Sequence, residues 1–318
     1  MNAIDLAEAS NVAVYATMVT LTFAMVAFAV SFAAARSVDV PVGVSSSKQQ
    51  FGSSVLVADQ PDAGSSPFEQ GRRAANIGMS LTWLSSVLLL IGVTLRGMWA
   101  GRVPWGNMYE FSITSALGVL GVFLIWSIKR DLRWLGLFVV IPTLLTLGLS
   151  VTVLYTEAAQ LVPALKSYWL IIHVSAAIVC AGAFTVAAST AGLAIARTRG
   201  ENKGTADKGL LRNFPSAERL QVLTYRLVAF SFPLWTFSVI AGAIWAENAW
   251  GRYWGWDPKE TWAFITWVVY AGYLHARSTA GWRGDRASWI AILGLVTFLI
   301  NYFGVNMFVN SLHSYAGV

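Results

Sequence analysis

Eight long apolar stretches constrain the fold of this chain more than any other feature. They cover residues 12–35, 77–98, 108–128, 134–154, 168–193, 224–247, 258–277 and 288–310. Each is long enough to cross about 30 Å of hydrocarbon as a helix. Backbone polar groups find no water in lipid, so a spanning segment must be a helix or part of a closed barrel. Barrel strands alternate apolar and polar residues, and these stretches do not. The sequence predicts an all-α, polytopic membrane protein with about eight transmembrane helices.

The low charge content agrees with a membrane protein. Only 12% of the residues are charged, whereas soluble domains have about 25%. The net charge of +6 does not indicate nucleic-acid binding, because the basic residues lie between apolar stretches rather than on one clustered face. The single cysteine, Cys180, falls inside an apolar stretch and is expected to be a small core residue.

The basic residues are distributed unevenly between the two sets of loops. Seventeen of the 22 lie on one side: Arg36, Lys48, Arg72, Arg73, Lys129, Arg130, Arg133, Arg197, Arg199, Lys203, Lys208, Arg212, Arg219, Arg226, Arg277, Arg283 and Arg286. The other side holds Arg96, Arg102, Lys166, Arg252 and Lys259. Because basic loops stay in the cytoplasm, the first set is expected to be cytoplasmic. Both termini and the segment 250–262 are then expected outside.

Composition divides the chain into two parts. Residues 37–70 are rich in Ser, Gly, Asp, Gln and Pro, which predicts a flexible cytoplasmic loop. The expected organisation is a first transmembrane helix with this loop at 1–76, followed by a membrane domain at 77–318. No internal repeat or soluble domain is evident.

The segment WGRYWGWDPKETW, residues 250–262, contains a strong helix start. Asp257 suits the N-cap, Pro258 suits the first helical position, and Glu260 can accept a hydrogen bond from the backbone N–H of the cap. Asp257 therefore has a complete structural explanation. Whether it also contacts a ligand is left open by the sequence.

The tryptophans of this segment allow two interpretations. Trp250, Trp254, Trp256 and Trp262 fall within 13 residues. They could form part of an aromatic belt at the membrane surface, or a platform for a large, flat, apolar ligand. In the second case Arg252 and Lys259 could meet carboxylates of the ligand.

The chain has only three histidines, His173, His275 and His313. His173 is expected near the external end of the fifth helix and His313 just beyond the external end of the eighth. His275 follows Pro258 by 17 residues, about 26 Å deeper at 1.5 Å per residue. If the last helix continued, Asn306, Asn310 and His313 would share one face.

The three histidines can be interpreted separately or together. Taken singly, His173 could be a hydrogen-bonded core residue, His275 an interfacial residue and His313 a tail residue. Taken together, two external imidazoles beside an aromatic platform favour a haem whose iron has two axial histidines. Zinc would need a larger set of ligands.

The residues carry a resemblance to a known family. The segment 250–262 resembles the tryptophan-rich "WWD" signature of haem-handling membrane proteins, and the whole pattern resembles the CcsA/ResC family of system II cytochrome c biogenesis proteins, called CcsB in some bacteria. Further segments similar to that family are YWLIIH ending at His173, LHAR around His275, NSLHSY around His313 and PWGNMYE at 104–110. The loop 37–70 lies outside the resemblance.

The resemblance implies a function and a set of site residues. Haem b would be carried to the external face and presented for thioether attachment to Cys-x-x-Cys-His of apocytochrome c. His173 and His313 would be axial ligands of the external haem, and His275 would bind an inner haem whose second histidine comes from a ResB-type membrane partner. Trp250, Trp254, Trp256 and Asp257 would lie at the haem edge. Apocytochrome c and thiol-reducing proteins would be further partners, and the location would be the cytoplasmic membrane.

Two alternatives remain at this level. The chain could export haem without a part in its attachment, because transport and synthesis would share both sites. It could also be a quinone-linked electron carrier of the cytochrome b type. That function usually needs paired histidines from one chain at each haem, and here only the external pair is available.

Overall fold

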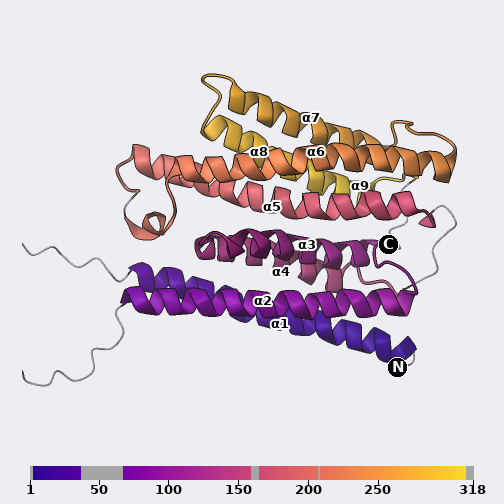
Figure 1. Ribbon diagram of the computed structural model, residues 1–318, viewed down its shortest axis with the longest axis horizontal. Coiled ribbons are helices and arrows are strands. Elements are labelled where there is room, and N and C mark those ends of the chain that lie inside the picture. Colours follow the sequence, from indigo (N-terminus) through magenta and orange to yellow (C-terminus); the bar gives the residue numbers. More distant parts are fainter. Residues whose placement is uncertain (1–2, 37–66, 159–164, 207, 313–318) are drawn as a thin grey trace, which may run out of the picture.

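The computed structural model describes residues 3–36, 67–158, 165–206 and 208–312, and every regular element in these ranges is helical (Figure 1). The elements are α1 (Ala3–Arg36), α2 (Pro67–Ala100), α3 (Met108–Ile128), η1 (Arg133–Leu135), α4 (Gly136–Thr152), α5 (Tyr168–Asn202), η3 (Gly209–Asn213), α6 (Ala217–Trp250), α7 (Pro258–Ser278), α8 (Asp285–Leu299), η4 (Ile300–Gly304) and α9 (Val305–Phe308). Of the short elements, η1 and η3 are 3-10 turns and η4 is a π-helical turn.

The prediction of an all-α, polytopic membrane protein is confirmed. Eight long helices are present in the described ranges, and seven of them are long and apolar enough to cross a membrane. The exception is α7. Its 21 residues include Trp262, Trp267, Tyr270 and Tyr273, and charged residues lie in its first and last turns. These amphipathic and charged side chains lower its apolarity without shortening the helix.

Several helices are longer than the apolar stretches that predicted them. Helix α2 begins at Pro67 rather than 77, α5 continues to Asn202 rather than 193, and α6 begins at Ala217 rather than 224. Apolarity marks only the part of a helix that lies in hydrocarbon, whereas backbone hydrogen bonding continues beyond it. Residues 67–70 of the predicted flexible loop are therefore helical, and its remainder, 37–66, lies outside the described residues.

Helix α5 forms the centre of the bundle. It packs against α3, α6 and α8, and 67% of its most apolar window is buried, against 33–39% in the other candidate spans. Small residues permit this packing: a Cβ at Gly182 would lie 2.7 Å from the carbonyl oxygen of Gly118 on α3. Close contact between helix backbones through small residues is typical of membrane helices. Cys180 is fully buried here, as predicted.

One end of the bundle holds the Trp-rich segment 250–257 together with other loops and chain ends. The loop from α2 to α3, the loop from α6 to α7 and the ends of the described chain at Ala3 and Leu312 all lie there (Figure 1). We call it the pocket end. The loops from α3 to α4, α5 to α6 and α7 to α8 lie at the opposite end, which we call the basic end.

Candidate haem site

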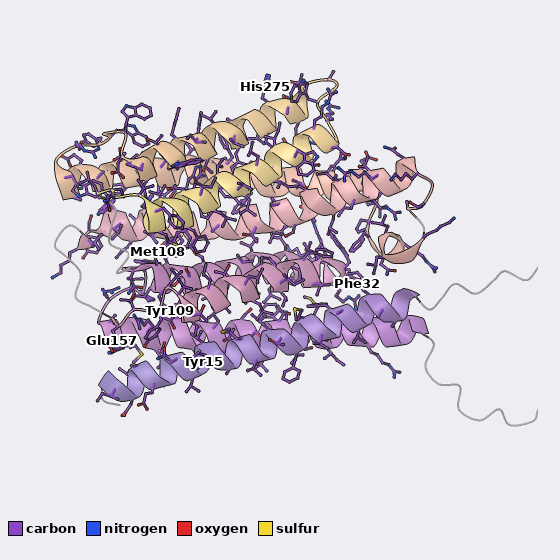
Figure 2. The ribbon with its side chains drawn as sticks, turned by 180° about the vertical axis from the view of Figure 1, so that it is seen from behind. Tyr15, Phe32, Met108, Tyr109, Glu157 and His275 are labelled. Atoms are coloured by element: carbon purple, nitrogen blue, oxygen red, sulfur yellow. The ribbon has the colours of Figure 1, made fainter. Side chains whose placement is uncertain are left out.

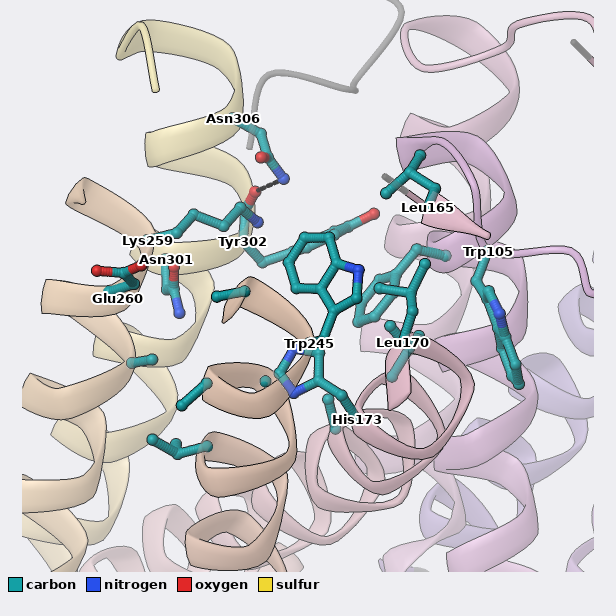
Figure 3. A pocket seen from close by; sticks show the side chains of 18 of the residues that line it. Trp105, Leu165, Leu170, His173, Trp245, Lys259, Glu260, Asn301, Tyr302 and Asn306 are labelled. Carbon is teal, nitrogen blue, oxygen red and sulfur yellow. Dashed lines mark hydrogen bonds between the residues drawn. The ribbon is translucent and has the colours of Figure 1, made fainter. Parts of the chain in front are cut away.

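A pocket opens at the pocket end between α3, α5, α6, α7 and α8 (Figure 3). Its cavity volume is about 210 Å³, and the space inside it reaches about 1220 Å³ when the open mouth is counted. Aromatic rings dominate its walls: Trp105, Phe111, Trp235, Trp245, Tyr253, Trp254, Phe298 and Tyr302. The other polar and charged side chains that line the pocket belong to Asn107, His173, Lys259, Glu260, Asn301 and Asn306. This lining suits a large, flat, mostly apolar ligand with a few polar groups.

His173 lies in this pocket with a defined orientation. Its Nδ1 is 2.7 Å from the backbone oxygen of Ser238 on α6, and the Ser238 hydroxyl donates to the His173 carbonyl at 3.0 Å. A carbonyl oxygen can only accept, so Nδ1 of the neutral ring carries the hydrogen. The Nε2 atom then keeps its lone pair and can ligate a metal.

The position of the His173 ring also depends on Gly242, one turn after Ser238 on α6. A Cβ at this residue would lie 2.8 Å from both Cε1 and Nδ1 of His173. No side chain fits there unless the imidazole moves, so Gly242 leaves the space that the ring occupies. Helices α5 and α6, which pack along their length, therefore fix the ring between them.

The tryptophans of the Trp-rich loop, residues 250–257, do not act as one platform. Trp254 lines the pocket, whereas Trp250 packs against Trp245 with ring centroids 4.8 Å apart and does not line it. Trp256 is 64% exposed and packs edge-on against Trp254 and Phe264. Within the described ranges, Trp256 is the one non-glycine residue with positive φ, at 58°, a conformation that is uncommon for a bulky side chain.

Asp257 forms the predicted N-cap of α7, in a capping box with Glu260. Its Oδ2 accepts from the backbone N–H of Lys259 at 3.3 Å, and Glu260 accepts from the N–H of Asp257 at 3.0 Å. The second oxygen, Oδ1, accepts from the backbone N–H of Leu312 at 3.0 Å. The Asp257 side chain is 8% exposed. Through its two oxygens it connects the start of α7 with the segment that immediately precedes His313 in the sequence.

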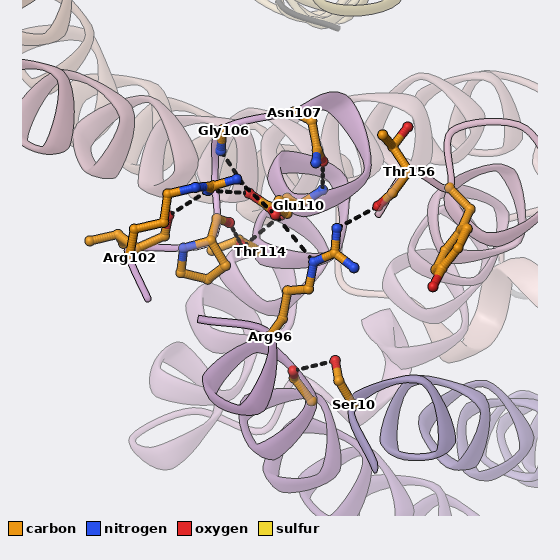
Figure 4. Close-up of polar contacts among 12 residues, drawn as sticks. Ser10, Arg96, Arg102, Gly106, Asn107, Glu110, Thr114 and Thr156 are labelled. Carbon is orange, nitrogen blue, oxygen red and sulfur yellow. Dashed lines mark hydrogen bonds and ion pairs between the residues drawn. The ribbon is translucent and has the colours of Figure 1, made fainter. Parts of the chain in front are cut away.

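The two loops that flank the pocket are each supported by an ion pair between an arginine and a glutamate. The sequence analysis did not detect this similarity between the two loops. In the α2–α3 loop, Glu110 pairs with Arg102 at 2.6 Å and accepts from the Gly106 N–H at 2.8 Å (Figure 4). In the α6–α7 loop, Glu260 pairs with Arg252 at 3.0 Å and accepts from the Gly255 N–H at 2.8 Å. Each arginine precedes its glutamate by eight residues, and each glutamate lies in the first turn of its helix.

The α2–α3 version carries an additional cation. Arg96, on α2, donates from Nε to Glu110 at 3.1 Å and from Nη2 to the Thr156 carbonyl. Arg96 and Glu110 are both fully buried, and the Arg96 guanidinium also lies over the rings of Trp99 and Tyr109. This cluster fixes the loop that brings Trp105 and Asn107 to the pocket.

His275 is placed far from the pocket. It lies in the last turn of α7 and is exposed, and Figure 2 places it at the other end of the bundle from Met108, which lines the pocket. His313 lies outside the described residues. The expected face shared by Asn306, Asn310 and His313 is not formed as a helix, because α9 ends at Phe308.

The C-terminal wall of the pocket contains residues that sequence reasoning did not select. Tyr302 belongs to the π-helical turn after α8, donates to the Met108 carbonyl at 2.7 Å and lies 2.7 Å from the Ser112 hydroxyl. Its ring packs on Phe111. Single π turns occur often at functional sites. The one available signal was the run of amides and aromatics at 301–306, which resembles an ordinary apolar helix when read alone.

The lining fits the haem that the sequence analysis predicts. The site has an imidazole with its lone pair available, a glycine that makes room for it, and aromatic walls, and these features suit a porphyrin with a ligated iron. Among the residues that the structure describes, no group of three or more His, Cys, Asp or Glu side chains could hold a bare metal ion.

Comparison with known proteins identifies the family. The family model of cytochrome C assembly proteins matches residues 105–313. Among curated proteins, the cytochrome c biogenesis protein CcsA of Guillardia theta is 37% identical over 265 residues, covering 78% of this chain and 88% of that protein. CcsA of Prochlorococcus marinus is 36% identical over 257 residues (73% and 81%), and CcsA of Microcystis aeruginosa is 35% identical over 289 residues (75% and 87%). The chain therefore belongs to the CcsA family of cytochrome c biogenesis proteins.

Proposed function

We propose that this chain is the membrane subunit of a system II cytochrome c synthase, and that its pocket holds haem b as cargo for attachment to apocytochrome c. The observation that carries the proposal is the orientation of His173. Its Nδ1 is fixed by Ser238, so Nε2 is available in a pocket with aromatic walls. Membership of the CcsA family supports the part in cytochrome c maturation.

The residues of the pocket would position the cargo rather than react with it. His173 provides one axial ligand, and His313 follows Leu312, whose backbone is held by Asp257, so His313 is the proposed second ligand. Trp105, Trp245 and Trp254 would cover the porphyrin and exclude water. When bound, haem supplies the vinyl groups that form thioethers with the two cysteines of Cys-x-x-Cys-His. Holding those groups beside the thiols is a large part of the catalytic task.

His275 is the proposed ligand of an inner haem. It is exposed at the basic end, and no metal-binding cluster of the described residues includes it. A single exposed imidazole supports a ligand set completed by another chain, here a ResB-type partner. Apocytochrome c and thiol-reducing proteins are the other proposed partners.

The proposed orientation follows from the loops. The basic end would face the cytoplasm by the positive-inside rule, and the pocket would face outward across the cytoplasmic membrane. This orientation would present the cargo on the side where apocytochrome c is matured.

The experiment is an absorption spectrum of the full chain, purified with its partner, combined with an assay of cytochrome c maturation. His173→Ala should lower the haem absorption of the external site and abolish maturation, and added imidazole should restore part of both. Ile172→Ala is the matched control, because the neighbouring Ile172 is 40% exposed and does not line the pocket. An unchanged spectrum with normal maturation in His173→Ala would contradict the ligand role. Covalent cytochrome c formed by the purified wild-type complex separates a synthase from a haem exporter.

A further inference from the structure

Two cations of the Trp-rich loop region, Arg252 and Lys259, could meet an anionic group, and the structure distinguishes them. Arg252 Nη1 lies 3.0 Å and 3.4 Å from the two oxygens of Glu260, so its charge is already balanced. The Lys259 side chain lines the pocket, with Nζ 5.7 Å from the centre of the Tyr302 ring. Its ammonium forms no hydrogen bond or ion pair with any residue that the structure describes.

The carboxylates near Lys259 are committed to other donors. Glu260 accepts from Arg252 and from the backbone N–H groups of Gly255 and Asp257. Asp257 accepts from the backbone of Lys259 and of Leu312. Both acids therefore support the loop and the helix end, and neither forms an ion pair with the lysine ammonium, although the charge of Asp257 acts on it from a greater distance. An ammonium inside a mostly apolar pocket is costly unless an anion accompanies it.

A second polar group beside Lys259 lacks a partner. The Oδ1 atom of Asn301 is buried and has no hydrogen-bond partner, and the residue lines the same pocket. Figure 3 shows Asn301 and Lys259 on the wall formed by α7 and the π-helical turn, and the Lys259 ammonium lies over the ring of Tyr302, the residue that follows Asn301. Rotation of the amide exchanges its oxygen for its NH₂ group, so Asn301 can present donors to an anion. Two unsatisfied polar side chains thus occur at one place in the pocket.

We propose that Lys259, with Asn301 beside it, forms a carboxylate subsite that receives a propionate of the bound porphyrin. The proposal rests on the proposed haem-binding function and deepens it. In Figure 3, His173 lies below Trp245 while Lys259 and Asn301 lie on the α7–α8 side. A porphyrin whose iron is ligated by His173 would then have its carboxylate edge directed to that side. The subsite would fix the rotation of the porphyrin in its plane, and therefore the place of its vinyl groups.

The experiment compares two probes that differ only in their carboxylates: ferric protoporphyrin IX and its dimethyl ester. Both retain the iron, so the contribution of His173 cancels. Affinities are measured by quenching of tryptophan fluorescence on the full chain in nanodiscs. The wild type should bind the diacid about tenfold more tightly than the ester, as expected for one charge-assisted hydrogen bond. Lys259→Met should abolish this preference and leave affinity for the ester unchanged, and Lys259→Arg should retain most of the preference.

The controls make each outcome decisive. Unchanged ester binding in Lys259→Met shows that the pocket has remained folded. Lys166→Met removes an exposed cation from the same end of the bundle and should retain the full preference. If the wild type shows no preference, or Lys259→Met keeps it, the carboxylate subsite is wrong while the haem pocket stands. If the wild type binds neither probe, the proposed function falls and this inference with it.

Discussion

Asp257 connects two segments that are 55 residues apart in the chain. One oxygen caps α7, a local role, and the other accepts from the backbone of Leu312, a tertiary role. The two roles need two separate acceptors, which a carboxylate has and a hydroxyl lacks. A serine at this position therefore separates the roles, because serine is a good N-cap but has a single side-chain oxygen.

We expect Asp257→Ser to keep α7 intact and release the segment around Leu312. Amide hydrogen exchange of the peptide that contains Leu312 should become faster, while exchange in α7 should remain unchanged. Asp257→Ala should in addition destabilise the start of α7, by about 1 kcal/mol for a lost cap. Asp131→Ser, which changes an exposed carboxylate at the basic end, is the control and should leave Leu312 unaffected. Slow exchange at Leu312 in Asp257→Ser would show that other contacts hold this segment.

At the scale of elements, α5 determines how closely the bundle packs around the pocket. It carries His173 near its start, and farther along it contacts α3 through Gly182 and Gly118. The same helix contains Gly192, where an added Cβ would meet nothing within 4 Å. These two glycines therefore separate helix propensity from helix packing within a single element.

We expect Gly182→Ala and Gly192→Ala to change stability in opposite directions. The Cβ of Gly182→Ala would collide with the α3 backbone, and overpacking of this kind costs roughly 1–3 kcal/mol. The Cβ of Gly192→Ala is unhindered, so the better helix propensity of alanine should stabilise the protein by roughly 0.5–1 kcal/mol. Thermal unfolding of the purified chain in detergent measures both. Equal effects of the two substitutions would argue against the close contact between α3 and α5.

At the scale of the whole molecule, the pocket is built by segments from most of the chain. The α2–α3 loop, the start of α5, the end of α6, the start of α7 and the π-helical turn after α8 all contribute to its lining. The two flanking loops are each supported by an Arg–Glu pair of the same spacing. Consecutive long helices run in opposite directions, so alternate connections lie at the same end of the bundle. The segments that line the pocket therefore lie at one end and the basic loops at the other.

We expect this separation of ends to be visible in intact cells as a labelling pattern. Lys166→Cys places a thiol at the pocket end and Lys203→Cys places one at the basic end, both at exposed positions. A membrane-impermeant maleimide should label the first in intact cells and the second only after lysis. The native Cys180 is fully buried and should give no background. The reverse pattern would contradict the proposed orientation.

The sequence by itself determined the helices and the start of α7. Apolar length decides which segments cross lipid, since the backbone must satisfy its own hydrogen bonds there. The cap at Asp257, Pro258 and Glu260 depends on neighbours within one turn, so it could also be predicted. The helix ends were less certain, because apolarity stops at the membrane surface and the helix does not. A face shared by Asn306, Asn310 and His313 required the last helix to continue, but α9 ends at Phe308. Apolar composition does not mark a helix end, so the sequence could not predict this.

Only the tertiary structure decided which side chains meet. It placed Trp254 in the pocket and Trp250 and Trp256 outside its lining. It also showed Arg252 paired with Glu260, while Lys259 has no ion-pair partner among the described residues. It also brought Tyr302 and Asn301 to the pocket from a segment that resembles an ordinary apolar helix. The physical reason is that helix formation depends on residues close in sequence. The pocket depends instead on helix packing, through contacts such as Gly118 with Gly182 and Gly242 with His173, between segments distant in the chain.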